Sequence, residues 1–131
     1  MIHVTRCQPS VRFALIAPAG FRILAAIDSL PALLSRDIFI SCGTEAHPLA
    51  DPHSTGEAYD VSVMGWSGVE IETALTALRQ TLGPLFYAQY EVQNSASDLT
   101  PSRLAVVNPN ATGSHLHTQR RKGTIYPPVN L

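Results

Sequence analysis

Two separated stretches of the chain carry the residues best suited to chemistry. Residues 52–60 contain an imidazole at His53 and, seven residues later, a carboxylate at Asp60. Much further along, His115 and His117 offer two more imidazoles at i and i+2. Because alternate side chains of a β-strand point to the same face, we expect these two histidines to face one cleft.

Two imidazoles and one carboxylate form a donor set that suits zinc, a borderline-soft ion. Three protein ligands leave a fourth position for water, which is typical of catalytic rather than structural zinc sites. We therefore expect one zinc ion per chain. Cys7 and Cys42 form no CxxC motif, so we expect no thiolate zinc site. Cys42 ends an apolar run and is interpreted as a small hydrophobic residue.

Composition bounds the remaining possibilities. A chain of 131 residues is predicted to form one domain, residues 1–131, that can bury a single core. A hydrophobic content of 45% and a charged content of 15% are typical of globular proteins. The net charge of −1 gives no basis for binding nucleic acid or anionic membranes. The basic cluster at residues 120–122 is expected in a solvated turn.

The residue pattern of the N-terminal region does not predict a targeting signal. The apolar run 13–21 is interrupted by Pro18 and followed by Arg22, which makes a poor signal peptide and no membrane-spanning helix. We therefore expect synthesis in the cytoplasm. Residues 1–19 are expected to lie over the core or to add a short extended piece.

Hydrophobic periodicity and turn residues predict the secondary structure. We expect two short helical pieces across 20–35, a strand at 38–42 buried on both faces, a loop at 43–57, a strand at 58–63, a helix capped by Ser67 that ends at Gly83-Pro84, strands at 85–92 and 103–107, and a last strand from Leu116.

The expected strand at 58–63 decides how Asp60 is interpreted. Alternation places Ala58, Asp60 and Ser62 on one face of this strand. A carboxylate inside a strand is poorly suited to a core unless it is paired or bound to a metal, which favours a functional role for Asp60. Glu57, inside the same motif, is expected to face solvent.

At this point the residues resemble a known superfamily. The strand at 38–42 and the pattern His-x2-Gly-x-Ala-x-Asp over residues 53–60 resemble the signature of zinc D-Ala-D-Ala metallopeptidases. Residues 114–117 resemble the closing His-x-His motif of the same superfamily, which includes lysostaphin-type endopeptidases and the hedgehog signalling domain. The resemblance covers roughly residues 20–120 and is strongest to small phage and bacterial versions.

The resemblance implies roles for five residues. His53, Asp60 and His117 would be the zinc ligands, and His115 would act as a base or stabilise the tetrahedral oxyanion. In some members a glutamate just before the last histidine is the base. No glutamate occupies that position here, so Glu91, at the end of the preceding strand, is the candidate.

Together the element pattern and the resemblance predict an α+β fold, with a small antiparallel β-sheet and helices packed on one side, similar to hedgehog and D,D-peptidase domains. The predicted function is zinc-dependent hydrolysis of a peptide bond in the peptidoglycan stem peptide, as in an endolysin or a cell-wall remodelling enzyme. The predicted activity is that of a D,D-carboxypeptidase or of an L,D- or D,D-endopeptidase. Residues 43–45 lack the arginine that in the resembling carboxypeptidases holds a terminal D-alanine carboxylate, which counts against carboxypeptidase specificity and leaves endopeptidase cleavage open. The alternative is a non-catalytic zinc domain of the same fold that acts in binding or assembly.

Overall fold

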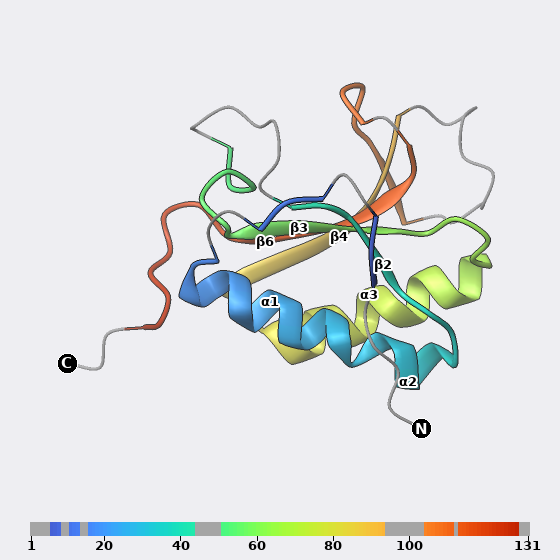
Figure 1. Cartoon of the computed structure of the whole chain (residues 1–131), viewed down its shortest axis with the longest axis horizontal. Coiled ribbons are helices and arrows are strands. Elements are labelled where there is room, and N and C mark those ends of the chain that lie inside the picture. Colours follow the sequence, from blue (N-terminus) through green and yellow to red (C-terminus); the bar gives the residue numbers. More distant parts are fainter. Residues whose placement is uncertain are drawn as a thin grey trace.

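The computed structural model describes residues 6–8, 11–13, 16–43, 51–93, 104–111 and 113–128. Within these residues six strands form one sheet in the order β1-β2-β3-β6-β4-β5, and the helices lie along one face of it (Figure 1). The elements are β1 Arg6–Cys7, α1 Pro18–Asp28, α2 Leu30–Leu34, β2 Phe39–Cys42, β3 Ala58–Ser62, α3 Gly68–Leu82, β4 Phe86–Val92, β5 Ala105–Val107 and β6 His115–Arg120.

The sheet is mixed. Its central pairs, β2–β3, β3–β6 and β6–β4, are antiparallel, whereas the outer pairs β1–β2 and β4–β5 are parallel. The predicted α+β class is confirmed, and the helices do lie on one side, but the prediction of a purely antiparallel sheet is wrong at both edges. At one edge the reason is the crossover between β1 and β2, where α1 and α2 return the chain to its starting direction.

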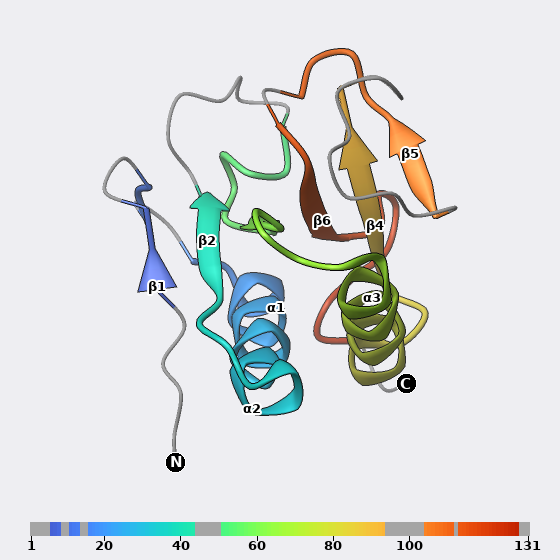
Figure 2. The same ribbon diagram turned by 90° about the vertical axis from the view of Figure 1, so that its right-hand side faces the viewer.

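The two helical pieces predicted across 20–35 are α1 and α2, but α1 begins earlier than expected. Pro18 occupies its first turn instead of breaking the segment. The absent N–H of proline costs nothing at this place, because the first N–H groups of a helix have no acceptor within it. Figure 2 shows α1 and α3 side by side beneath the strands. Among the described residues, no helix is both long enough and apolar enough to cross a bilayer.

The start of α3 is fixed by the predicted Ser67 cap. The Ser67 hydroxyl accepts a hydrogen bond from the Glu70 N–H at 3.1 Å, and the Glu70 carboxylate accepts one from the Ser67 N–H at 3.1 Å. This reciprocal arrangement is a capping box. The helix ends at Leu82, before Gly83 with its φ of 76°, as predicted.

Substitution of Ser67 by alanine is expected to lower the free energy of unfolding by about 1 kcal/mol, because an N–H at the helix start loses its acceptor. Chemical denaturation of the metal-free protein measures this. Ser67→Asp, which keeps an acceptor oxygen, should unfold like the wild type. Equal stability of Ser67→Ala and the wild type would show that the cap contributes nothing.

The two faces of the sheet have opposite characters. Tyr59 and Val61 of β3 and Leu116 of β6 point toward the helices and are fully buried, whereas Asp60 and Ser62 line a cleft on the other face. This is the alternation expected for residues 58–63. The core between the sheet and the helices includes Ile23, Ile27, Ile40, Tyr59, Val61, Ile71, Leu75, Leu78, Tyr90 and Leu116.

Candidate metal centre

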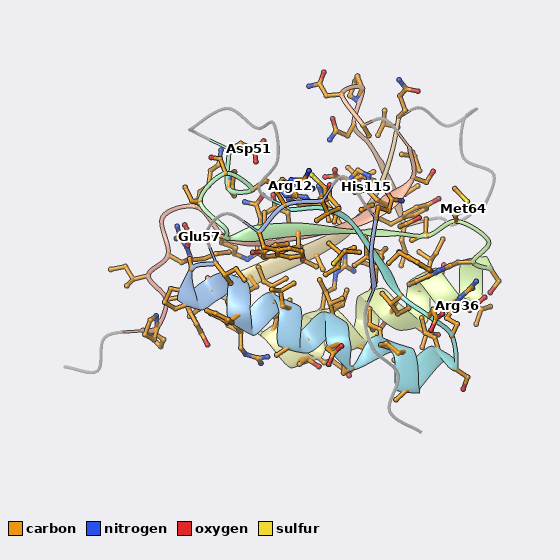
Figure 3. The ribbon with its side chains drawn as sticks, viewed as in Figure 1. Arg12, Arg36, Asp51, Glu57, Met64 and His115 are labelled. Atoms are coloured by element: carbon orange, nitrogen blue, oxygen red, sulfur yellow. The ribbon has the colours of Figure 1, made fainter. Side chains whose placement is uncertain are left out.

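The central strands bring the predicted site residues together on the face away from the helices. Asp60 of β3 is paired with His117 of β6, and His117 is paired with Gln89 of β4. One step along, His115 is paired with Glu91. Asp60, Glu91, His115 and His117 line one cleft of about 850 Å³ together with His53. Figure 3 shows the labelled His115 above the sheet, opposite α1 and α3.

His53 reaches this face from a tight loop, residues 51–57. The Asp51 carboxylate accepts a hydrogen bond from the His53 N–H at 2.8 Å, and the Gly56 N–H donates to the His53 carbonyl at 3.0 Å. The loop rests directly on α1, since a Cβ at Gly20 would lie 2.0 Å from the Gly56 carbonyl oxygen. These contacts hold His53 in place, and only 4% of the residue is exposed.

Glu57 closes the same loop onto β6. It was expected to face solvent, which is wrong: it is half-buried and paired with Arg120, whose Nη2 lies 3.1 Å from Glu57 Oε1. The hydrogen bond from Arg120 lowers the pKa of Glu57, although burial opposes this. Arg120 is the last residue of β6, so the expectation of a solvated turn fails for it, whereas residues 121 and 122 are exposed and the turn lies at residues 122–123.

The Asp60 carboxylate is the centre of the cluster, because three imidazole rings converge on it. His117 Nδ1 lies 2.7 Å and His53 Nε2 3.4 Å from its Oδ1. His115 Nε2 lies 3.6 Å from its Oδ2. Burial disfavours the charged form of Asp60, but the hydrogen bonds from His117 and His53 outweigh it and bring the pKa well below its usual range. Asp60 is therefore an anion throughout the physiological range.

Both nitrogens of His117 face acceptors. Nδ1 donates to Asp60, and Nε2 donates to the Gln119 side-chain oxygen at 2.8 Å. The Gln119 amide is oriented by its own NH2 group, which donates to the Arg120 carbonyl at 3.2 Å. A ring that donates from both nitrogens is an imidazolium. Burial opposes this charge, but the hydrogen bond to Asp60 outweighs it and raises the pKa of His117 to about 9.

These two pKa shifts predict how the stability of the metal-free protein depends on pH. The pKa of His117 rises on folding from 6.5 to about 9, so its contribution is complete below pH 6.5 and is lost as the pH rises through 9. A shift of this size corresponds to on the order of 3 kcal/mol. Because the pKa of Asp60 falls on folding, its contribution is present above about pH 4 and is lost in acid.

We therefore expect the metal-free protein to be most stable between about pH 4 and 6.5. Thermal unfolding in the presence of a chelator, followed from pH 4 to 10, measures this. In His117→Gln most of the alkaline loss should disappear. An equally steep alkaline loss in that variant would show that His117 is not its source.

Glu91 is connected to the cluster by a hydrogen bond with His115. Its Oε1 lies 3.0 Å from His115 Nε2 and accepts from the Asn108 amide at 3.0 Å, while Gln89 donates to its other oxygen. Burial disfavours the carboxylate, but these hydrogen bonds, with that of His115 foremost, lower the pKa of Glu91 to about 2. The His115 Nδ1 donates to the Gly113 carbonyl at 3.0 Å, so this ring also donates from both nitrogens.

The residues that hold Glu91 and His117 in place were not predicted from the sequence. Gln89 and Gln119 occupy alternate positions with Glu91 and His117 on their strands. Gln89 lies two residues before Glu91, and Gln119 lies two residues after His117. Because alternation places residues two apart on the same face of a strand, this spacing could have identified both glutamines as neighbours of the site. Asn108 lies in a turn beyond the strands, and no local pattern identifies its partner.

Two groups of side chains among the described residues could hold a metal ion. The ligand atoms of Cys42, His53 and Asp60 lie within 4.8 Å of one another, as do those of Asp60, His115 and His117. The predicted ligands His53, Asp60 and His117 are divided between these groups, with Asp60 in both. The distance of 3.4 Å between His53 Nε2 and Asp60 Oδ1 fits two ligands of a tetrahedral zinc, about 3.3–3.4 Å apart.

Cys42 was not expected at this site, and an irregularity in β2 explains its position. Ile40 is paired with Val61, but Cys42 is paired with Asp60, so a two-residue step on β2 faces a one-residue step on β3. Ser41 is the extra residue of this β-bulge. The interpretation of Cys42 as a small hydrophobic residue did not anticipate its place in the cleft, where the thiol lies near His53 and Asp60. Burial of this strand on both faces is wrong as well, since Phe39 is 39% exposed.

Comparison of the chain with known protein families, curated proteins and solved structures gives no match. The resemblance to zinc peptidases therefore stays a prediction from the residues. Thr44 and Glu45, where the carboxylate-binding arginine is missing, lie outside the described residues.

Proposed function

We propose that the chain is a zinc-dependent hydrolase that cleaves a peptide bond in bacterial peptidoglycan. The observation that carries this proposal is the buried Asp60 carboxylate on which three imidazoles converge in one cleft. The cleft, at about 850 Å³, is in the size range of pockets that bind small ligands. Buried ionisable groups gathered in a cleft are typical of functional sites.

In this proposal His53, Asp60 and His117 hold the ion. Asp60 Oδ1 lies 3.4 Å from His53 Nε2 and 2.7 Å from His117 Nδ1, so Asp60 is the residue that joins the two histidines. Gln119 accepts from the other nitrogen of His117, which is the usual arrangement for a metal-binding histidine because it fixes the ring. Zinc bound by three such ligands supplies an acidified water and polarises a carbonyl group.

His115 is the residue proposed to act on the substrate. Its Nε2 is 3.6 Å from Asp60 Oδ2, beside the proposed ligands, and its ring donates from both nitrogens. An imidazolium at this place can stabilise the negative charge of a tetrahedral intermediate or give a proton to the leaving amine. Once His115 Nε2 has given up its proton, the same nitrogen can act as a base.

Glu91 is better suited to positioning His115 than to accepting a proton itself. Its oxygens are engaged by His115, Asn108 and Gln89. A carboxylate held in this way orients an imidazole and stabilises its charged form. This assignment refines the prediction that Glu91 is the base.

The choice of peptidoglycan follows from the resemblance of residues 53–60 and 114–117 to cell-wall peptidases. Purified protein loaded with zinc and incubated with purified peptidoglycan tests it, with mass spectrometry of the products. Zinc-dependent release of D-alanine would identify a carboxypeptidase, and severed cross-links without that release an endopeptidase. Intact peptidoglycan after incubation with zinc-loaded protein would overturn the proposal.

A second candidate function is a non-catalytic zinc domain. The observation that favours it is the position of Cys42 beside His53 and Asp60. A fourth protein ligand would leave no position for water, as in structural zinc sites. In that case replacement of His115 would leave both metal content and partner binding unchanged.

A further inference from the structure

We propose that the Cys42 thiolate is a fourth metal ligand in the resting protein, together with His53, Asp60 and His117. This inference rests on the metal site proposed above but not on the hydrolysis of peptidoglycan. It also deepens that proposal, because a fourth protein ligand would control access to the ion.

The first support is the position of the thiol. The ligand atoms of Cys42, His53 and Asp60 lie within 4.8 Å of one another, although they come from β2, the loop 51–57 and β3. Sulfur and nitrogen ligands of one tetrahedral zinc are about 3.5 Å apart. The thiol and the imidazole therefore have to approach from within 4.8 Å to about 3.5 Å when the ion binds, and His117 joins the group through Asp60, which belongs to both groups.

The second support is the β-bulge. Regular antiparallel pairing after Ile40 and Val61 would bring Cys42 opposite Tyr59, on the face that packs against the helices. The bulge instead brings Cys42 opposite Asp60, and both Ser41 and Cys42 line the cleft. A small hydrophobic residue would be accommodated in the core without any bulge. Bulges occur beside functional sites, where they redirect a side chain.

The third support is charge. Zinc brings two positive charges into a cluster where Asp60 and His53 are more than nine-tenths buried. With Asp60 as the one anionic ligand, the bound site would keep a net positive charge. Coordination by Cys42, whose thiol releases its proton to solvent, adds a second anion and makes the four-ligand site neutral. A neutral site has the smaller desolvation cost at this depth.

The consequence is a closed resting site. Four protein ligands leave no position for water or substrate, so Cys42 must leave the ion before hydrolysis can begin. Cys42→Ser should therefore bind zinc more weakly than the wild type but hydrolyse its substrate faster when it is fully loaded. Cys42 in this account regulates the site and takes no part in the reaction.

Cobalt tests the proposal without any activity assay. Co²⁺ replaces Zn²⁺ in such sites, and a coordinated thiolate adds a charge-transfer band in the near ultraviolet. We expect this band in the wild type and in Cys7→Ser, the matched control, because Cys7 is exposed on β1. In Cys42→Ser the band should be absent, and the affinity for cobalt should fall at least tenfold.

The outcomes separate this inference from the proposed function. Cobalt binding by the wild type without a thiolate band would overturn the role of Cys42 and leave the other three ligands standing. A band that persists in Cys42→Ser would overturn it as well. Absence of cobalt binding in all three proteins would overturn both the inference and the metal site. The wild-type spectrum decides the question even if Cys42→Ser does not fold.

Discussion

Asp60→Asn protein should be purified without bound zinc, and its affinity for added zinc should be at least about 100-fold lower than that of the wild type. Asp60 is the residue shared by both groups of ligand atoms, and three imidazoles converge on its carboxylate. Loss of a residue that only hydrogen-bonds to a metal ligand already lowers the affinity for the metal by about 10–100-fold. Loss of the central anionic ligand should cost more.

The substitution keeps the size of the side chain, so the effect on zinc binding is separable from packing. Without its counter-ion, the buried His117 imidazolium should also destabilise the metal-free protein, by about 3–5 kcal/mol. Competition with a chromophoric chelator measures the affinity. Asp28→Asn is the matched control, because Asp28 is exposed at the end of α1, across the sheet from the cleft. Wild-type zinc affinity in Asp60→Asn would contradict the proposed site.

His115→Ala should reduce kcat by about 10²–10⁴, the usual contribution of a positioned acid or base. The zinc content should stay near one per chain, because His53, Asp60 and His117 remain. The combination of retained metal and lost turnover is the mark of a residue that acts on the substrate. A change in KM alone would instead indicate a role in substrate binding.

The experiment compares kcat, KM and zinc content for His115→Ala and for Asn110→Ala, an exposed residue that lines the same cleft. Asn110→Ala should keep its kcat. If His115→Ala loses its zinc, the ligands are Asp60, His115 and His117, the second group of the structure. If turnover is unchanged, His115 has no part in the reaction, and the role proposed for it is wrong.

The parts of the fold that were predicted correctly are those with strong local signals. The helix α3 carries apolar residues at helical spacing. Ser67 caps its start and Gly83 follows its end, both as predicted. The i and i+2 spacing of His115 and His117 placed both on one face, because the alternation of a strand does not depend on the rest of the fold. The same reasoning brought Asp60 to that face.

The parts that were missed depend on pairing between distant segments. A single-residue bulge in β2 turns Cys42 from the core to the cleft, and its position depends on the register with β3. The parallel edges of the sheet depend on crossovers that no local pattern records. The ion pair between Glu57 and Arg120 joins residues 63 positions apart, so the sequence around Glu57 gave no sign of its partner.

The most direct test of the metal centre is the zinc content of the purified protein, measured by elemental analysis before and after incubation with excess zinc and dialysis. We predict about one zinc per chain, retained on dialysis and removed by a chelator, with a higher Tm for the loaded protein because the ion binds only the folded state. A protein that contains no zinc, takes up none from solution and shows the same Tm with and without it would contradict the account.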